Sequence, residues 1–122
     1  MLLQIAEREL ASGIMLTELK GRLALGRESQ RLESLVDQYA GEGHLRVIFD
    51  LTGVEYVDSA GIGLLALAAG KLKESGGKLA VVAAEGRVLN LLKLTQVNAL
   101  MAVCPNVDAA LGVLSQGLQA SA

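Results

Sequence analysis

A nearly continuous apolar segment at residues 46–51, Arg-Val-Ile-Phe-Asp-Leu, constrains the fold of this chain more than any other feature. It has the length of a β-strand, and a strand without the usual apolar and polar alternation is typical of a central strand covered on both faces. A second strand of this kind is predicted at residues 78–82, and an apolar helix running through residue 74 lies between the two. Buried strands joined by a helix indicate a parallel sheet.

The rest of the chain extends this alternation of strands and helices. We expect further strands at residues 2–7, 14–19 and 100–103, and helices at residues 27–39, 87–94 and from 107 to about 116. Ser12-Gly13 is expected to form a hairpin turn, and Thr52-Gly53 to interrupt the central strand. These elements predict an α/β fold with a four- to five-stranded mixed sheet, mainly parallel, and about four helices. We expect one domain over residues 1–115 and a short flexible tail at residues 116–122.

Composition and charge argue against several classes of protein. Apolar residues make up 52% of the chain, which supports a packed core. The formal net charge is −2 and the chain has only two tyrosines and one phenylalanine, which argues against nucleic-acid binding. One cysteine, Cys104, and one histidine, His44, provide neither an internal disulfide nor a metal cluster. Residues 60–70, the longest apolar run, are too few for a membrane span. We therefore expect a cytoplasmic protein without metal or cofactor.

The turn after the central strand, Asp58-Ser-Ala-Gly61, is the first place to expect function, because sites in α/β sheets gather at the carboxyl ends of strands. Ser59 directly precedes the long helix, so one interpretation makes its hydroxyl the helix N-cap. The other makes Ser59 a phosphate acceptor, since free N–H groups and the helix dipole stabilise an anion there. A phosphate beside Asp58 would repel a partner that docks on the neutral hydroxyl.

A catalytic role for this serine is disfavoured. A nucleophile elbow has the pattern Gly-x-Ser-x-Gly, and Val57 stands where the first glycine is needed. His44 precedes the central strand and is expected at the opposite end of the sheet, as a solvated loop residue. The glycines form no nucleotide-binding motif, and Cys104 is expected to be a small buried hydrophobe. We predict no catalytic residue and no enzymatic activity.

The leucine-rich part of the long helix admits two interpretations, a dimerisation surface or core packing. Core packing is the simpler explanation for residues that follow a buried strand, and a monomer is the default expectation. The residues concerned are Leu64, Leu65, Leu67, Ala68 and Leu72.

Residues 47–63, Val-Ile-Phe-Asp-Leu-Thr-Gly-Val-Glu-Tyr-Val-Asp-Ser-Ala-Gly-Ile-Gly, resemble the signature of STAS domains, particularly anti-sigma factor antagonists. The segments Leu-Lys-Gly-Arg-Leu at 19–23, Gly-Gly-Lys-Leu at 76–79 and Leu-Leu-Lys-Leu-Thr at 91–95 also have counterparts in that family. The resemblance covers roughly residues 2–115. One departure is Ala24, where the family often carries aspartate after the Gly-x-Leu turn.

The resemblance implies a bacterial regulatory phosphoprotein that acts in transcription through protein binding. A kinase-like anti-sigma factor would bind only the unphosphorylated form, which frees a sigma factor, and would phosphorylate Ser59; a separate phosphatase would restore the hydroxyl. The implied partner-binding residues are Asp58, Ser59, Ala60, Gly61, Ile62, Gly63 and Leu64, with Gly21, Arg22 and Leu23 from a nearby turn. An alternative role for such a domain is a docking subunit of a lipid- or anion-transport assembly.

Overall fold

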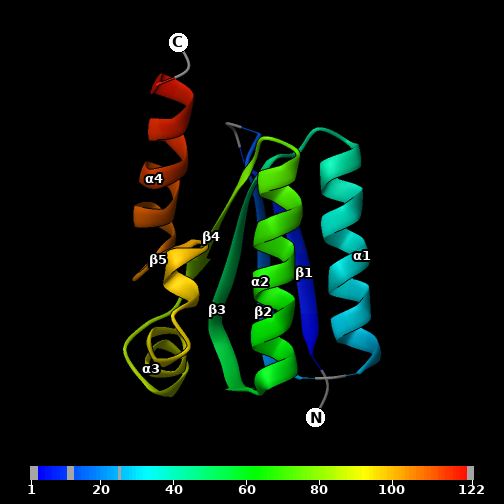
Figure 1. The fold of residues 1–122 in the computed structure, drawn as a ribbon, viewed down its shortest axis with the longest axis vertical. Coiled ribbons are helices and arrows are strands. Elements are labelled where there is room, and N and C mark those ends of the chain that lie inside the picture. The colour runs from blue at the N-terminus through cyan, green and yellow to red at the C-terminus, as the bar shows by residue number, and fades with distance from the viewer. Residues whose placement is uncertain (1–2, 11–12, 25, 121–122) are drawn as a thin grey trace.

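The computed structural model describes residues 3–10, 13–24 and 26–120 of the chain, and their strands form one five-stranded sheet (Figure 1). The strands lie in the order β1-β2-β3-β4-β5, which is also their order in the sequence. β1 is antiparallel to β2, and each later strand is parallel to its neighbour. The bounds are Gln4–Glu9 for β1, Met15–Leu23 for β2, Arg46–Val57 for β3, Lys78–Val82 for β4 and Ala102–Cys104 for β5.

Helices cover both faces of this sheet, which confirms the predicted α/β architecture. α1 and α2 lie side by side on one face, and α4 packs against β4 and β5 on the other (Figure 1). The helices are α1 (Arg27–Gly41), α2 (Ser59–Glu74), α3 (Arg87–Leu94) and α4 (Val107–Ala120), with a short 3-10 helix η1 (Val97–Ala99) after α3.

The central strand alternates its side chains between two apolar cores. Val47 and Phe49 belong to the core beneath α1 and α2, whereas Ile48 belongs to the core beneath α4. All three side chains are fully buried. The nearly continuous apolar run in this segment, from which the fold was predicted, therefore results from burial on both faces.

The predicted interruption of the central strand at Thr52-Gly53 is wrong, because β3 continues to Val57. The irregularity lies instead in the pairing of β3 with β2, whose register shifts between Glu18 and Lys20 and again after Gly21. Gly53 permits this packing, since a Cβ atom there would lie 2.7 Å from Cγ of Lys20. Asp50 stabilises this part of β3 by accepting hydrogen bonds from the backbone N–H and the hydroxyl of Thr52.

Other differences from the predicted elements concern their ends. The last strand begins at Ala102, because Leu100 belongs to the end of η1. β1 runs from Gln4 to Glu9 instead of over residues 2–7, and the predicted hairpin turn at Ser12-Gly13 lies partly outside the described residues. α4 continues past Gln116 to Ala120. The domain boundary at residue 115 and the flexibility of the tail stay predictions.

Candidate partner-binding site around Ser59

The junction between β3 and α2 is formed by Asp58, which is the N-cap of the helix. Its Oδ1 accepts a hydrogen bond of 2.8 Å from the backbone N–H of Gly61. The interpretation of Ser59 as the N-cap is therefore wrong: Asp58 has the extended backbone of a cap, and Ser59 is already the first helical residue. Among the described residues, the Ser59 side chain has no hydrogen-bond partner, and it is exposed.

The segment from Gly21 to Leu23, expected as a turn near Ser59, is instead the end of β2, and it lies directly beside this helix start. The carbonyl oxygen of Leu23 accepts a hydrogen bond of 3.3 Å from the backbone N–H of Asp58. A Cβ atom at Gly61 would overlap the same carbonyl oxygen. Glycine at position 61 therefore allows the first turn of α2 to approach the backbone of β2 closely.

The predicted partner-binding residues divide by their exposure. Three of them are buried and serve packing, so they offer a partner little side-chain surface: Gly61, Leu64 and Leu23. The others are exposed or half-buried: Asp58, Ser59, Ala60, Ile62, Gly63, Gly21 and Arg22. The structure thus brings the two predicted segments together, and their assignment as a binding surface stays a prediction.

A shallow groove beside Ser59 was missed by the sequence analysis. We call it the α1–α2 groove; it has a volume of about 280 Å³ and is lined by Ser29, Gln30, Glu33, Ala60, Gly63, Leu64 and Leu67. Leu67 is 43% exposed, so the expectation of core packing fails for this leucine, whereas Leu64, Leu65, Ala68 and Leu72 are buried as expected. The helical spacing of Ala60, Gly63 and Leu67 could have indicated a common outward face.

The sequence analysis also did not anticipate a role for Tyr56 at this end of the sheet. It pairs in register with Arg22 on the parallel neighbour β2. The guanidinium carbon of Arg22 lies 4.1 Å from the centroid of the Tyr56 ring, which is a cation–π geometry. Their proximity depends on the two register shifts between β2 and β3, which no local sequence pattern reveals.

His44 lies in the loop before β3, at the opposite end of that strand from Ser59, so the predicted separation of the two residues is confirmed. The two side chains therefore cannot act together as a nucleophile and its base. His44 is half-buried, which corrects the expectation of a solvated residue, and its ring meets that of Tyr39 edge-on at a centroid distance of 6.4 Å.

Cys104 is buried, as predicted, and burial raises the pKa of its thiol. A thiol with a raised pKa is a poor nucleophile at neutral pH. Within the described part of the chain, no cluster of three or more histidine, cysteine or acidic side chains is arranged to hold a metal ion. None of the helices described here is long and apolar enough to cross a membrane.

The match of a family model decides which family this sequence represents. The model of the STAS domain matches residues 6–110, which is most of the chain. This chain belongs to the STAS domain family. No curated protein is similar enough to be matched to the sequence.

Several solved structures share the STAS fold of this chain. An anti-sigma factor antagonist from Mycobacterium paratuberculosis has a TM-score of 0.79 and 21% identity, covering 93% of this chain and 94% of that protein. The Bacillus cell fate determinant SpoIIAA in its phosphorylated form has a TM-score of 0.70 and 14% identity, over 90% and 99% of the two chains. A sulfate transporter family protein from Wolinella succinogenes has a TM-score of 0.75 and 20% identity, over 91% and 97%. At these identities the likeness extends to the fold alone.

Proposed function

We propose that this STAS domain is an anti-sigma factor antagonist switched by phosphorylation of Ser59. In its unphosphorylated form it binds an anti-sigma factor that has serine-kinase activity, and a sigma factor is thereby released. The observation that carries the proposal is the position of Ser59, an exposed hydroxyl on the first residue of α2 whose capping role is taken by Asp58. A kinase can reach this hydroxyl without breaking any contact that holds the helix start.

The start of α2 is suited to carry a phosphate. The backbone N–H groups of Ser59 and Ala60 have no hydrogen-bond partner among the described residues, because they precede the first N–H donor of the intrahelical ladder. Both groups belong to the positive end of the dipole of a 16-residue helix. A phosphate on Ser59 would therefore be stabilised locally, and the hydrogen bond from Gly61 to Asp58 would remain.

The same phosphate would disfavour partner binding. Ala60 and Gly63 are small and exposed, so a partner that packs on this face must approach the backbone of α2 closely. A phosphoserine adds about −1.5 to −2 charges next to the carboxyl group of Asp58. Closing an interface over that charge would require its desolvation without a compensating cation, which is costly. Phosphorylation thus converts a favourable contact into an unfavourable one.

In the phosphorylation step this chain acts as substrate, with the partner providing ATP and magnesium. The Ser59 Oγ attacks the γ-phosphorus, ADP leaves, and the hydroxyl proton passes to a base on the partner. A phosphatase then hydrolyses the phosphate ester with water, which restores the hydroxyl. No catalytic residue of this chain is required in either direction.

The proposal is tested by calorimetric titration with the kinase-type anti-sigma factor of the same organism. Ser59→Ala should bind like the wild type and stay unmodified with ATP and magnesium, whereas Ser59→Asp should weaken binding at least about tenfold. Ser75→Asp places the same charge on an exposed residue at the other end of α2 and should leave affinity unchanged. Equal affinity of Ser59→Ala and Ser59→Asp would contradict the switch and favour constitutive docking, as in a transport assembly.

A further inference from the structure

The α1–α2 groove combines apolar residues of one helix with a carboxylate of the other. Its lining on α2 includes three exposed residues, Ala60, Gly63 and Leu67. Glu33 on α1 lines the same groove, and its side chain is 42% exposed. A protein surface that closes over the groove therefore covers apolar atoms and a carboxylate together. The covered carboxylate then needs a compensating charge, because burying an unpaired charge is costly.

The carboxylate of Glu33 is only partly compensated within the chain itself. Lys71 on α2 is shared between two carboxylates of α1, because its Nζ lies 2.8 Å from Oδ1 of Asp37 and 3.4 Å from Oε1 of Glu33. The pKa of Lys71 is raised, chiefly by its hydrogen bond to Asp37 and to a smaller extent by Glu33. One ammonium group thus faces two carboxylates, and the more distant of the two lies in the groove.

The other basic residues of the two helices lie away from this carboxylate. Arg31 is two positions before Glu33, and residues at that spacing do not face each other on a helix. Arg27 is four positions before Arg31 and shares its side of α1, while Lys73 is two positions after Lys71 and faces away from it. In the described part of the chain, Lys71 provides the only ion pair of Glu33. The groove therefore has an excess of negative charge at its Glu33 end.

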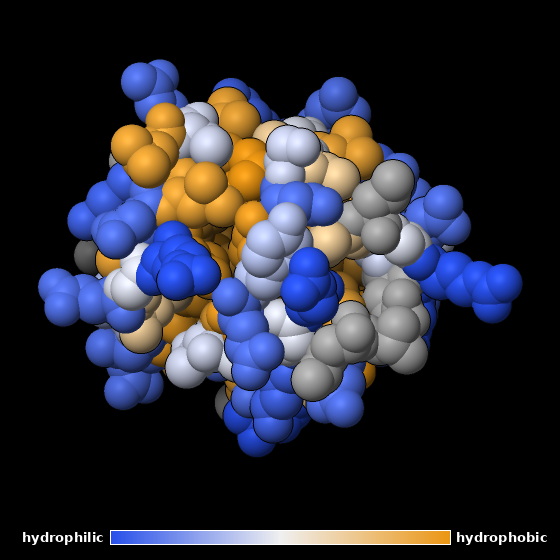
Figure 2. All heavy atoms as spheres, turned by 90° about the horizontal axis from the view of Figure 1, so that it is seen from below, coloured by the Kyte–Doolittle hydropathy of each residue, from blue (hydrophilic) through white to orange (hydrophobic). Residues whose placement is uncertain are grey.

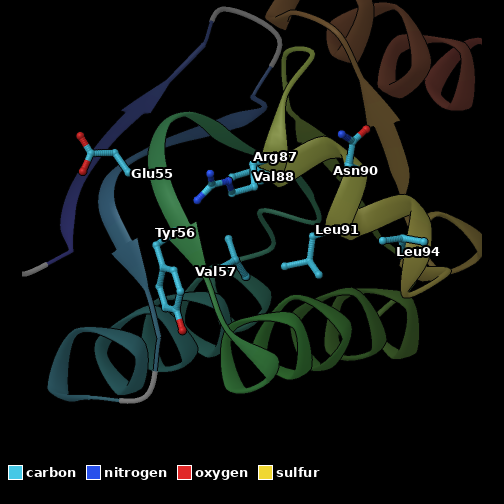
Figure 3. A pocket seen from close by; sticks show the side chains of 8 residues that line it. All are labelled: Glu55, Tyr56, Val57, Arg87, Val88, Asn90, Leu91 and Leu94. Atoms are coloured by element: carbon cyan, nitrogen blue, oxygen red, sulfur yellow. The ribbon is translucent and has the colours of Figure 1, made fainter.

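This charge distinguishes the α1–α2 groove from the rest of the surface near Ser59. Figure 2 views the end of the molecule where α2 begins, and it shows hydrophilic side chains interspersed with apolar ones. The groove between α3 and the end of β3 is larger, about 360 Å³, but its lining includes charges of both signs, Glu55 and Arg87 (Figure 3). That groove therefore does not indicate the charge of an occupant, whereas the α1–α2 groove does.

A long basic side chain matches both properties of the α1–α2 groove. The stem of a lysine or arginine is apolar and its head is charged, so the stem can pack on Gly63 and Leu67 while the head reaches the carboxylate of Glu33. Leu67 lies about 12 Å further along α2 than Ser59. This exceeds the screening length of about 8 Å at physiological ionic strength, so a cation there does not neutralise a phosphate on Ser59.

We propose that Glu33 determines partner specificity by pairing with a basic side chain of the anti-sigma factor that lies along the α1–α2 groove. The inference rests on the proposed function and adds to it the chemistry of the partner's surface. Lys71 competes with the partner for the carboxylate of Glu33 and thereby limits the affinity. A partner surface that lacks the cation leaves Glu33 desolvated and unpaired, which disfavours its binding.

Calorimetric titration with the kinase-type anti-sigma factor of the same organism tests the pairing. Glu33→Gln keeps the size of the side chain but removes its charge, and it should raise the dissociation constant about tenfold. Lys71→Met removes the competing ammonium and should lower the dissociation constant about threefold. Glu42→Gln removes the same charge at the exposed end of α1 and should bind like the wild type. The difference between Glu33→Gln and the wild type should shrink at high ionic strength.

The opposite effects of Glu33→Gln and Lys71→Met separate partner binding from a structural role. If the ion pair only held α1 against α2, both variants would change affinity in the same direction. Unchanged affinity of Glu33→Gln, or weaker binding of both variants, would overturn the inference; the proposed function would stand if Ser59→Asp still weakened binding. A wild type that does not bind the anti-sigma factor would overturn both. Circular dichroism of each variant verifies that the fold is retained.

Discussion

At Gly61, a Cβ atom would overlap the carbonyl oxygen of Leu23, which also accepts the hydrogen bond from Asp58. Gly61→Ala should therefore lower the free energy of unfolding by about 1–3 kcal/mol, because neither backbone can move without disturbing the strand pairing. Gly63→Ala is the matched control, since a Cβ atom there has open space. It should raise stability by about 0.5–1 kcal/mol. Urea denaturation compares the two variants, and a Gly61→Ala variant as stable as the wild type would contradict this account.

Tyr39 provides a second test at the scale of one residue. Burial raises the pKa of its hydroxyl well above the ordinary range; the hydrogen bond with Thr17 lowers it, and the hydrogen bond with the carboxylate of Glu7 raises it. The folded state therefore holds the Tyr39 proton more tightly than the unfolded state does. The stability that this hydroxyl contributes is fully present below the unfolded pKa of about 10 and is lost as pH rises through the folded pKa. Above about pH 10, where the unfolded hydroxyl ionises and the folded one keeps its proton, the free energy of unfolding should fall with pH more steeply than in Tyr39→Phe. Equal slopes in the two proteins would refute the assignment.

The sequence located the turn between β3 and α2 but could not decide which of its two adjacent polar residues is the helix N-cap. Asp58 and Ser59 are both good N-cap residues, so propensity alone does not decide between them. The decision depends on which residue first adopts helical backbone angles, and Asp58, which stays extended, donates its backbone N–H to the carbonyl oxygen of Leu23 on β2. That contact joins residues distant in the sequence, so no local pattern could reveal it.

At the scale of elements, the outward face of α2 is the surface to test for partner binding. Gly63 and Gly70 both lie on exposed positions of α2 with open space around them, and only Gly63 lines the α1–α2 groove. Gly63→Leu should weaken binding of the anti-sigma factor at least about tenfold, because the added side chain keeps the partner from the backbone. Gly70→Leu should bind like the wild type. Calorimetric titration measures both, and equal affinities would remove the α1–α2 groove from the binding surface.

The limits of helical periodicity explain why the α1–α2 groove was not anticipated. Periodicity in α1 indicates which face is buried, but not which helix lies beside it. The neighbour is revealed only by tertiary contacts such as those of Lys71 on α2, whose Nζ lies 2.8 Å from Asp37 and 3.4 Å from Glu33 on α1. Ion pairs of this exposed kind contribute little to stability, so they mark the helix arrangement without determining it.

At the scale of the whole molecule, the fold could be predicted because the buried strands have a recognisable, nearly continuous apolar sequence. Lys78–Val82 and the helix Arg87–Leu94 have the bounds expected from the sequence, since each combines an apolar pattern with clear flanking glycines. The groove between α3 and the end of β3, whose lining includes Val57, Leu91 and Leu94, could not be predicted. Its shape depends on how α3 packs against β3. The sequence pattern also does not distinguish the exposed Leu94 from leucines that are buried.

Reversible phosphorylation of Ser59 can be measured by phosphosite mapping. The chain is isolated from its own cells under growth and under stress, and its phosphopeptides are quantified by mass spectrometry. We expect phosphate on Ser59, with an occupancy that changes between the two conditions. Ser59 that remains unmodified under all conditions would contradict it.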